Sequence, residues 1–360
     1  MNNDLDVVQN TLLKKVVRDK FKDCDYNNIK LIKSTTYPYS SIRIVKFTDE
    51  KRNPVILFIK RITIPKKKLA DVREKLECEA SLLQLLNKEM SGEAVELIEI
   101  FPEQKIIVTK KCAGSAIDTL MNAYTFWWKN DSAQKESRDN LALLCGSWLK
   151  RYHLATGRKN KDLEPWYDYL SGEMLWRTRA LKESLPEHSQ LFSEVSEMFR
   201  ARLKEIQHQG YACTYHGDFS GHNIFYEKDS IKVIDFYDAK IGHPFIDLIN
   251  FIASLAYRSE NPLYPKQRIG IFCRNFFKGY GEMLEQNKEL VYLLLLLQCI
   301  KRLHVITSNQ KIRLDRKLLN QRVIKQYTHY LNNHLQETNN RQKIEPWPFL
   351  NLTNLTCSTR

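Results

Sequence analysis

The sequence predicts an α+β protein of two lobes, in which a small lobe built on an antiparallel sheet precedes a larger, mainly helical lobe. Three observations support this fold class. Strand patterns fill residues 29–110, apolar stripes at helical spacing dominate after Gly114, and a short strand-rich island at 211–236 interrupts the helices. The expected segments are a first lobe over 1–110, a second lobe over 111–335 and an irregular tail over 336–360.

The first lobe should contain two hairpins with one helix between them. Residues 42–47 partly alternate and 55–59 are an apolar run, with polar residues between them that favour a turn. Residues 95–100 and 105–109 form a second such pair. Between the pairs, 68–88 predicts a helix because its leucines and alanine recur at helical spacing. We therefore expect a five-stranded sheet and one helix in this lobe.

The second lobe should be helical on both sides of the island. Apolar residues recur at helical spacing over 141–152, and 193–207 predicts another helix that Gly210 ends. The periodicity is lost from Arg341 onwards, which favours an irregular tail.

Composition and cysteine spacing favour a cytoplasmic protein. The chain is 43% hydrophobic and 27% charged, which excludes a disordered or fibrous protein. Its longest apolar run, 290–300, is too short to span a bilayer, and residues 1–10 do not resemble a secretory signal. The eight cysteines form no C-x-x-C pair, so we expect reduced, buried thiols and no zinc site.

Positive charge is concentrated near the end of the chain. Residues 301–330 carry eight Lys or Arg and one acid, a net +7 that is half of the total of +14. Such a stripe suits phosphates, acidic glycans, an anionic membrane surface or nucleic acid, and a solvated helix face is the alternative interpretation. No nucleic-acid-binding motif accompanies it, which disfavours that partner.

The island carries the residues with the clearest chemistry. His216, Asp218 and Asn223 form an H-x-D-x-x-x-x-N motif, and Asp235 directly follows an apolar strand. Mg²⁺ prefers oxygen ligands, so Asn223 and Asp235 are candidate ligands of the Mg²⁺ that accompanies a nucleoside triphosphate. Asp218 would accept the proton of an acceptor hydroxyl. Lys60 ends a strand and would contact the phosphates, held by an ion pair with Glu79 on the following helix.

These residues and their surroundings resemble the aminoglycoside phosphotransferase and choline kinase family. The resemblance rests on HGDFSGHNIF, VIDFYDA and GHPFIDL, together with the Lys60 strand and the helix that contains Glu79, and it covers about residues 29–280. It implies a protein-kinase-like fold of two lobes and a small-molecule kinase that uses ATP or GTP with Mg²⁺.

The resemblance also implies a role for each matching position. Asp218 is the expected catalytic base, and Asn223 and Asp235 are the expected metal ligands. The other implied roles are nucleotide binding by Lys60 and Glu79, adenine binding at the hinge by Lys110, Lys111 and Cys112, and support of the catalytic loop by Asp247 and His216. One stretch departs from the family, because the expected phosphate-covering loop at 34–41 contains no glycine.

The acceptor is expected to be a sugar or glycan. Aromatic side chains stack on sugar faces and on cations, and the candidates for an acceptor pocket are Trp127, Trp128, Trp166 and Tyr167. The net charge of +14 disfavours a polycationic aminoglycoside. The basic stripe is also consistent with peripheral contact to anionic membrane or to a glycolipid acceptor. The alternatives are an aminoglycoside or choline-type amino-alcohol kinase, and a catalytically silent kinase fold that binds nucleotide.

Overall fold

The chain separates into two units in the computed structural model. It describes residues 2–21, 29–49, 51–63, 69–90, 92–123, 132–158, 162–206, 211–261, 264–281, 287–308 and 314–340. One unit combines Met1–Ser115 with Ile224–Ala239, and the other combines Ala116–Asn223 with Lys240–Arg360. We call them unit 1 and unit 2.

Unit 1 is built on a five-stranded antiparallel sheet with strand order β1-β2-β3-β5-β4. The two expected hairpins are present as β2–β3 and β4–β5. The described part of the unit contains two helices where one was expected, because an N-terminal helix α1 precedes the sheet. The elements are α1 (Asn2–Lys20), β1 (Lys30–Thr36), β2 (Ser40–Thr48), β3 (Pro54–Ile62), α2 (Leu69–Glu89), β4 (Leu97–Phe101) and β5 (Ile106–Lys110).

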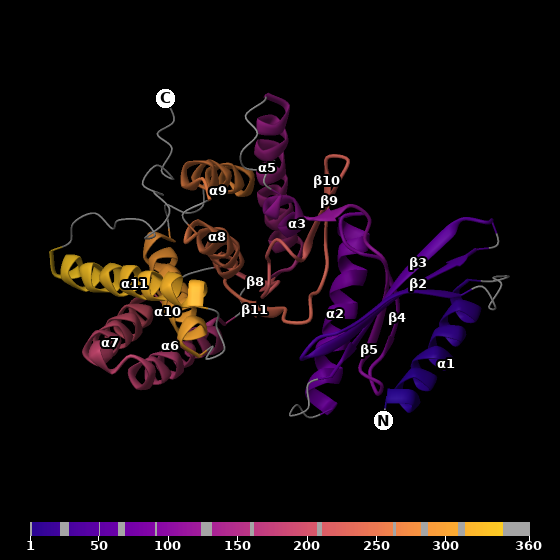
Figure 1. Ribbon diagram of the computed structural model, residues 1–360, viewed down its shortest axis with the longest axis horizontal. Coiled ribbons are helices and arrows are strands. Elements are labelled where there is room, and N and C mark those ends of the chain that lie inside the picture. Colours follow the sequence, from indigo (N-terminus) through magenta and orange to yellow (C-terminus); the bar gives the residue numbers. More distant parts are fainter. Residues whose placement is uncertain are drawn as a thin grey trace. The chain divides into compact units, whose positions relative to one another are not determined.

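The two faces of this sheet receive different side chains because strand residues alternate. Leu57 and Ile59 of β3 are buried in an apolar core with Val16 and Val17 of α1. Lys60, the next residue, therefore points to the opposite face, the side on which α2 lies (Figure 1). Strand alternation thus places Lys60 on the face of the sheet that α2, the helix of Glu79, covers.

A further hairpin, outside the five-stranded sheet, also belongs to unit 1. Strands β9 (Ile224–Glu227) and β10 (Ser230–Val233) pair across a tight turn in which Lys228 and Asp229 have positive φ angles of 48° and 59°. The main-chain N–H of Val233 donates to the carbonyl of Glu93. Because of this attachment, unit 1 is not the continuous 1–110 segment that the sequence led us to expect, and the strand-rich island is divided between the units.

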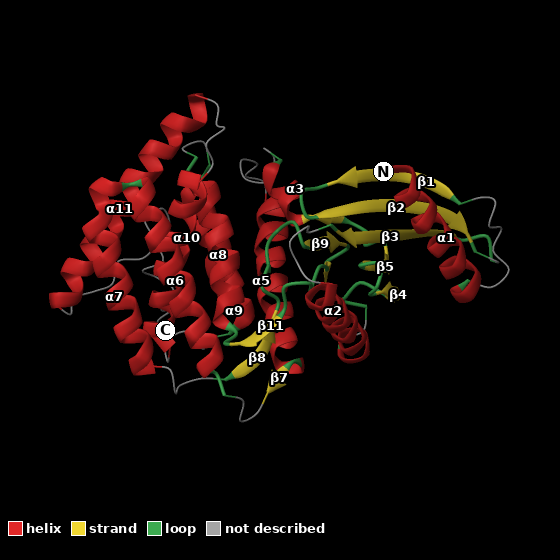
Figure 2. Cartoon of the chain, turned by 90° about the horizontal axis from the view of Figure 1, so that it is seen from below, coloured by secondary structure: helices red, strands yellow, loops and turns green. Residues whose placement is uncertain are grey.

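Unit 2 is mainly helical. It also contains a small sheet of order β11-β8-β7 (Figure 2). Helix α10 packs against α6, α7, α8 and α11. After β6 (Ser115–Ala116), the elements are α3 (Ile117–Asn122), α5 (Ser132–Ala155), β7 (Gly157–Arg158), α6 (Glu164–Ser184), the 3₁₀ turn η2 (Pro186–His188), α7 (Ser189–Ile206), β8 (Ala212–Tyr215), β11 (Lys240–Gly242), α8 (Phe245–Ser259), α9 (Lys266–Tyr280), α10 (Lys288–Ser308) and α11 (Leu314–Asn340).

Helix α10 passes the length and composition test for a membrane-spanning helix, since it is 21 residues long and contains the apolar run at 290–300. However, 61% of its apolar window is buried inside unit 2, as in the core helix of a folded domain. Helix α11 continues to Asn340, into the segment from 336 for which we expected irregular structure. Residues 341–360 lie outside the described residues.

Two glycines allow α5 and α9 to approach closely. A Cβ added at Gly279 of α9 would lie 2.2 Å from the carbonyl oxygen of Leu143, and one added at Gly146 of α5 would lie 2.0 Å from the carbonyl oxygen of Phe276. These distances are far below van der Waals contact, so any side chain at either position must separate the helix backbones.

We predict that Gly279→Ala lowers the free energy of unfolding by about 1–3 kcal/mol, because the added methyl group overpacks the α5–α9 contact. Gly172→Ala in α6 is the matched control, since no atom lies within 4 Å of its added Cβ. This control should instead stabilise the protein by about 0.5–1 kcal/mol through helix propensity. Urea unfolding of both variants tests the prediction, and equal effects of the two would contradict it.

Candidate active site

The H-x-D-x-x-x-x-N motif forms a loop in unit 2 directly after the buried strand β8. Residue Gly217 has a φ of 85°, a conformation that side chains rarely adopt, and it turns the chain between His216 and Asp218. His216 is fully buried, and its Nδ1 accepts a hydrogen bond from the main-chain N–H of Asp218 at 3.2 Å. The loop is therefore shaped locally by a glycine and a histidine that cap its first turn.

Asp247 of α8 anchors the same loop. Its carboxylate is fully buried and accepts hydrogen bonds from the main-chain N–H groups of His216 at 2.6 Å and Gly217 at 2.9 Å. Its Oδ2 also lies 3.0 Å from Nε2 of His153 on α5, whose Nδ1 lies 2.9 Å from the Tyr280 hydroxyl on α9. The loop is thus connected through one carboxylate to three helices.

His243 lies just before α8 and is buried without a countercharge. Burial, and next the positive charge of His153, lower the pKa of His243 from its usual 6.5 to about 3. Its Nδ1 accepts from the main-chain N–H of Phe245 at 3.3 Å, so the neutral form fits the site.

We predict that His243 makes the free energy of unfolding sensitive to acid. The unfolded chain takes up a proton below about pH 6.5, whereas the folded state does so only near pH 3. The free energy of unfolding should therefore fall by up to about 1.4 kcal/mol per pH unit as the pH decreases across this window. Urea unfolding at several pH values should give a smaller decrease for His243→Gln than for the unmodified protein. Parallel curves for the two proteins would rule out this assignment.

Asp218 is held in a dense polar environment while half of its side chain remains exposed. Its carboxylate receives hydrogen bonds from the Ser220 hydroxyl at 3.1 Å and the Asn223 amide at 3.0 Å, and it lies 3.1 Å from His222 Nε2. Burial by itself would raise the pKa of Asp218, but the hydrogen bond and charge of His222, with smaller effects of His216 and Ser220, outweigh it and lower the pKa. Asp218 is therefore ionised and oriented at neutral pH.

Asn223 is buried and presents its two amide atoms differently. The Nδ2 group donates to the main-chain oxygen and to the carboxylate of Asp218, at 2.9 and 3.0 Å. This orientation leaves the amide oxygen for another partner, and such an oxygen suits Mg²⁺. No group of three or more His, Cys, Asp or Glu that could hold a metal occurs in the described parts of the chain. A metal bound by the amide oxygen of Asn223 would therefore need further oxygen ligands, for example from a nucleotide or water.

In unit 1, Lys60 bonds to a different carboxylate from the one that we expected. Lys60 Nζ bonds to Asp235 Oδ1 at 2.5 Å, not to Glu79. Burial would lower the pKa of Lys60, but the negative charges of Asp235 and Glu79 outweigh it and raise the pKa. Asp235 has a φ of 66°, which is unusual for a residue with a side chain and marks a strained position.

Glu79 faces the same cluster but bonds to the main chain. Its Oε1 accepts from the N–H of Phe236 at 3.1 Å, and its Oε2 is buried with no hydrogen-bond partner. Burial raises the pKa of Glu79 to about 7, although the charge of Lys60 opposes this shift. Lys60 and Glu79 thus interact through their charges, and the Lys60 amine bonds to the Asp235 carboxylate instead of to Glu79.

The expected hinge follows β5. The N–H of Lys110 donates to the Glu96 carbonyl and that of Lys111 to the Ile56 carbonyl, so both donors are used within the sheet region. Cys112 is buried, and its carbonyl accepts from Lys111 Nζ at 3.4 Å. Of the three predicted hinge residues, Cys112 is therefore the one whose main-chain N–H remains a candidate for nucleotide binding.

The expected phosphate-covering loop is a short hairpin tip. Residues 34–36 belong to β1 and 40–41 to β2, so only three residues connect the strands. The N–H of Tyr37 donates to the Ser40 carbonyl at 2.7 Å and closes the turn. The glycine-free sequence at 34–41 thus forms a tight turn with exposed Tyr37 and Tyr39 at its tip.

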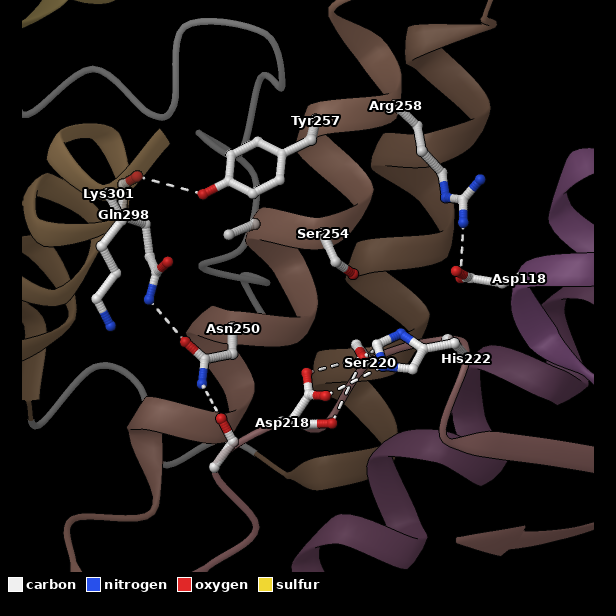
Figure 3. Close-up of a pocket in the computed structure, with 13 residues that line it drawn as sticks. Asp118, Asp218, Ser220, His222, Asn250, Ser254, Tyr257, Arg258, Gln298 and Lys301 are labelled. Atoms are coloured by element: carbon white, nitrogen blue, oxygen red, sulfur yellow. Dashed lines mark hydrogen bonds and ion pairs between the residues drawn. The ribbon is translucent and has the colours of Figure 1, made fainter. Parts of the chain in front are cut away.

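A pocket of about 530 Å³ lies beside Asp218 in unit 2 (Figure 3). Residues of α3, the loop of Asp218, α8 and α10 line it, among them Asp118, Asn250, Tyr257, Arg258, Gln298 and Lys301. Arg258 pairs with Asp118 at 2.6 Å and with the Asn122 side chain at 2.5 Å, which connects α8 to α3. Our reading of the sequence missed these residues. His222 and Ser220 lie within the motif and could have been found there.

Trp166 and Tyr167, two of the aromatic acceptor residues expected from the sequence, are not among the described residues that line this pocket. Trp166 and Tyr167 are 4% and 3% exposed and pack inside unit 2, where Trp166 lies against Gly242 and His243. A Cβ at Gly242 would lie 2.4 Å from the Trp166 ring, which shows how closely the residue is enclosed. We therefore interpret Trp166 and Tyr167 as core residues and no longer as acceptor-binding residues. Trp127 and Trp128 lie outside the described residues.

Comparison with known proteins shows what the chain is similar to. The model of the phosphotransferase enzyme family matches residues 61–285, more than half of the chain, whereas no curated protein matches. Among solved structures, an amicoumacin kinase in complex with AMP-PNP and Ca²⁺ gives a TM-score of 0.58 at 16% identity, covering 89% of this chain and 92% of that chain.

Two further structures show the same architecture. A choline kinase from Cryptosporidium parvum gives a TM-score of 0.55 at 13% identity, covering 92% of this chain and 97% of that chain. A glucosamine kinase gives 0.53 at 12% identity, covering 87% and 95%. Similarity at this level of identity shows the fold. The expected kinase-like fold, with a sheet-based and a mainly helical part, is therefore confirmed.

Proposed function

The chain belongs to the phosphotransferase enzyme family, and from this premise we propose that it transfers the γ-phosphate of ATP or GTP to a hydroxyl group of a small molecule, with Asp218 as the base. The single observation that carries the proposal is the state of Asp218. Its half-exposed carboxylate, ionised and fixed by three neighbours, borders a pocket large enough for a small acceptor.

The reaction follows from these positions. The acceptor oxygen attacks the γ-phosphorus, the bond between that phosphorus and the β,γ-bridging oxygen breaks, and the nucleoside diphosphate leaves with the electron pair. Asp218 accepts the hydroxyl proton as the oxygen loses it and passes it to solvent. Asp247 acts indirectly by holding the main chain of the loop, so that Asp218 keeps its direction.

Charge neutralisation of the phosphates is assigned to Lys60 and to a metal ion. Lys60 would bind the phosphates, supported by the negative charges of Asp235 and Glu79. The Asn223 amide oxygen and the Asp235 carboxylate fit Mg²⁺ by donor type, and the metal would supply charge neutralisation for the triphosphate. Adenine or guanine binding is assigned to the main chain around Cys112.

We favour a sugar or glycan as the acceptor. The pocket lining is rich in hydroxyl, amide and charged groups that can bond several hydroxyls, as a saccharide requires. An aminoglycoside or choline-type amino alcohol remains the alternative acceptor, and the solved kinases of similar fold include examples named for glucosamine and choline. Contact with anionic membrane stays a proposal that the basic stripe motivates.

Acceptor-dependent release of ADP or GDP tests this function. The protein is incubated with Mg²⁺ and either nucleotide, with and without polar metabolite extract, glycolipids or aminoglycosides. We expect release that depends on both Mg²⁺ and one acceptor class. Tight nucleotide binding without acceptor-dependent release would favour the alternative, a silent nucleotide-binding module, which the glycine-free hairpin tip motivates.

A further inference from the structure

We propose that the acceptor bears an anionic group, a carboxylate or a phosphate, and that Lys301 binds this group in the pocket beside Asp218. The inference rests on the proposed function and names the substrate class for the same site. It depends on the charges that face the pocket.

Most charged groups around the pocket are already paired. Arg258 is bound by Asp118, and Asp218 contacts His222 (Figure 3). Arg258 also donates to the side chain of Asn122. These contacts leave neither a spare guanidinium nor a spare carboxylate away from the reacting centre. A cationic acceptor would therefore have to compete with Arg258 for Asp118, or with the reaction for Asp218.

Lys301 differs from these groups. It lines the pocket from α10, one helical turn after Gln298, and within the described parts of the chain it makes no ion pair or hydrogen bond. Glu173 is a negative charge that acts on it, but Glu173 is bound to Arg177 at 3.0 Å. The pocket thus contains a largely buried amine that forms no ion pair with any described residue.

The surroundings of Lys301 strengthen this interpretation. Burial lowers the pKa of Lys301 to about 8, and the positive charges of Arg177 and Lys240 act in the same direction against Glu173. A bound anion would restore a normal environment for the ammonium group, because an opposite charge favours its protonated form. A buried cation without a partner is unfavourable, so a ligand that supplies the partner gains affinity.

The position of Lys301 relative to the reacting centre is held by hydrogen bonds. Asn250 donates to the carbonyl of Gly217 at 3.4 Å and accepts from Gln298 Nε2 at 2.6 Å. The Tyr257 hydroxyl donates to the Gln298 carbonyl at 3.2 Å. Through these contacts α10 is connected to the loop of Asp218, so an acceptor anchored at Lys301 would hold its hydroxyl in a constant direction.

The test compares acceptors that share one scaffold and differ in charge. Label transfer from γ-labelled ATP is measured to glucuronate, glucose, glucosamine and glucose 6-phosphate. We expect the anionic sugars to exceed glucosamine in kcat/KM, and the ratio of glucuronate to glucose 6-phosphate identifies the carboxylate or the phosphate as the anion. A preference for glucosamine in the unmodified protein would overturn the proposal.

Variants of Lys301 make the test specific to this side chain. Lys301→Gln should lower the anionic-to-cationic ratio of kcat/KM by about 10- to 100-fold through KM, Lys301→Glu should reverse it, and Lys301→Arg should retain it. Lys288→Gln, on the exposed start of the same helix, is the control and should leave the ratio unchanged. An unchanged ratio in Lys301→Glu would overturn the proposal.

A readout without catalysis separates this proposal from the proposed function. Lysines are ¹³C-methylated, and the NMR signal that Lys301→Arg removes is titrated with pH in the presence of glucuronate or inorganic phosphate. We expect these anions to raise its pKa, even if no sugar accepts phosphate. No effect of either anion on this signal would overturn the anion site, whereas an effect without transfer would overturn only the proposed reaction.

Discussion

Asp218→Asn is expected to lower kcat by about 10²- to 10⁴-fold, the usual contribution of a general base. Asparagine matches the shape of aspartate, so the neighbouring Ser220 and Asn223 can stay in place while proton acceptance is lost. The nucleotide dissociation constant should change little, because Asp218 is not assigned to the nucleotide. Steady-state kinetics with the identified acceptor and a nucleotide titration measure the two effects.

Asp229→Asn is the control for this substitution. It makes the same chemical change in an exposed acid on the β9–β10 turn, where asparagine also tolerates the φ of 59°. We expect full activity in this variant. If Asp218→Asn were as active as Asp229→Asn, Asp218 would not be the base.

Asp247→Ala is expected to lower the free energy of unfolding by about 3–5 kcal/mol, because it removes the acceptor of several buried hydrogen bonds at once. The substitution leaves the main-chain N–H groups of His216 and Gly217 and the ring of His153 without their acceptor. Asp247→Asn keeps one carbonyl oxygen and should lose less stability. Urea unfolding measures both variants.

The Asp247 variants should also lose activity in proportion to the disorder of the loop. Asp247→Asn, which folds more stably than the alanine variant, should show a lower kcat with a largely unchanged nucleotide dissociation constant. If the free energy of unfolding of Asp247→Ala fell by less than about 1 kcal/mol, Asp247 would not be the group that anchors the loop of Asp218.

Local periodicity explains why the main elements could be predicted from the sequence. The hairpins β2–β3 and β4–β5 and the helix α2 depend on alternation and on i,i+4 spacing, which neighbouring residues determine. The motif residues Asp218 and Asn223 lie five positions apart, so their contact at 3.0 Å also follows from short-range sequence.

Interactions between distant residues could not be predicted in this way. Asp118 and Arg258 are 140 positions apart, and neither lies in a motif that suggests a pair. Lys60 was assigned to Glu79 because both fit a known pattern, but the strained main chain at Asp235 brings that carboxylate to the amine instead. The residue type of Trp166 and its position between the hinge and the motif predict a pocket residue, whereas tertiary packing against Gly242 encloses it.

The central claim is most directly tested by following the labelled γ-phosphate itself. Unmodified protein and Asp218→Asn are incubated with Mg²⁺ and γ-labelled ATP or GTP, together with separated fractions of sugars, anionic sugars, glycolipids and aminoglycosides. The account predicts a labelled phosphate ester in a hydroxylated sugar fraction, above all an anionic one, that is lost in Asp218→Asn. Label in no fraction while nucleotide remains bound, or equal labelling by the two proteins, would contradict it.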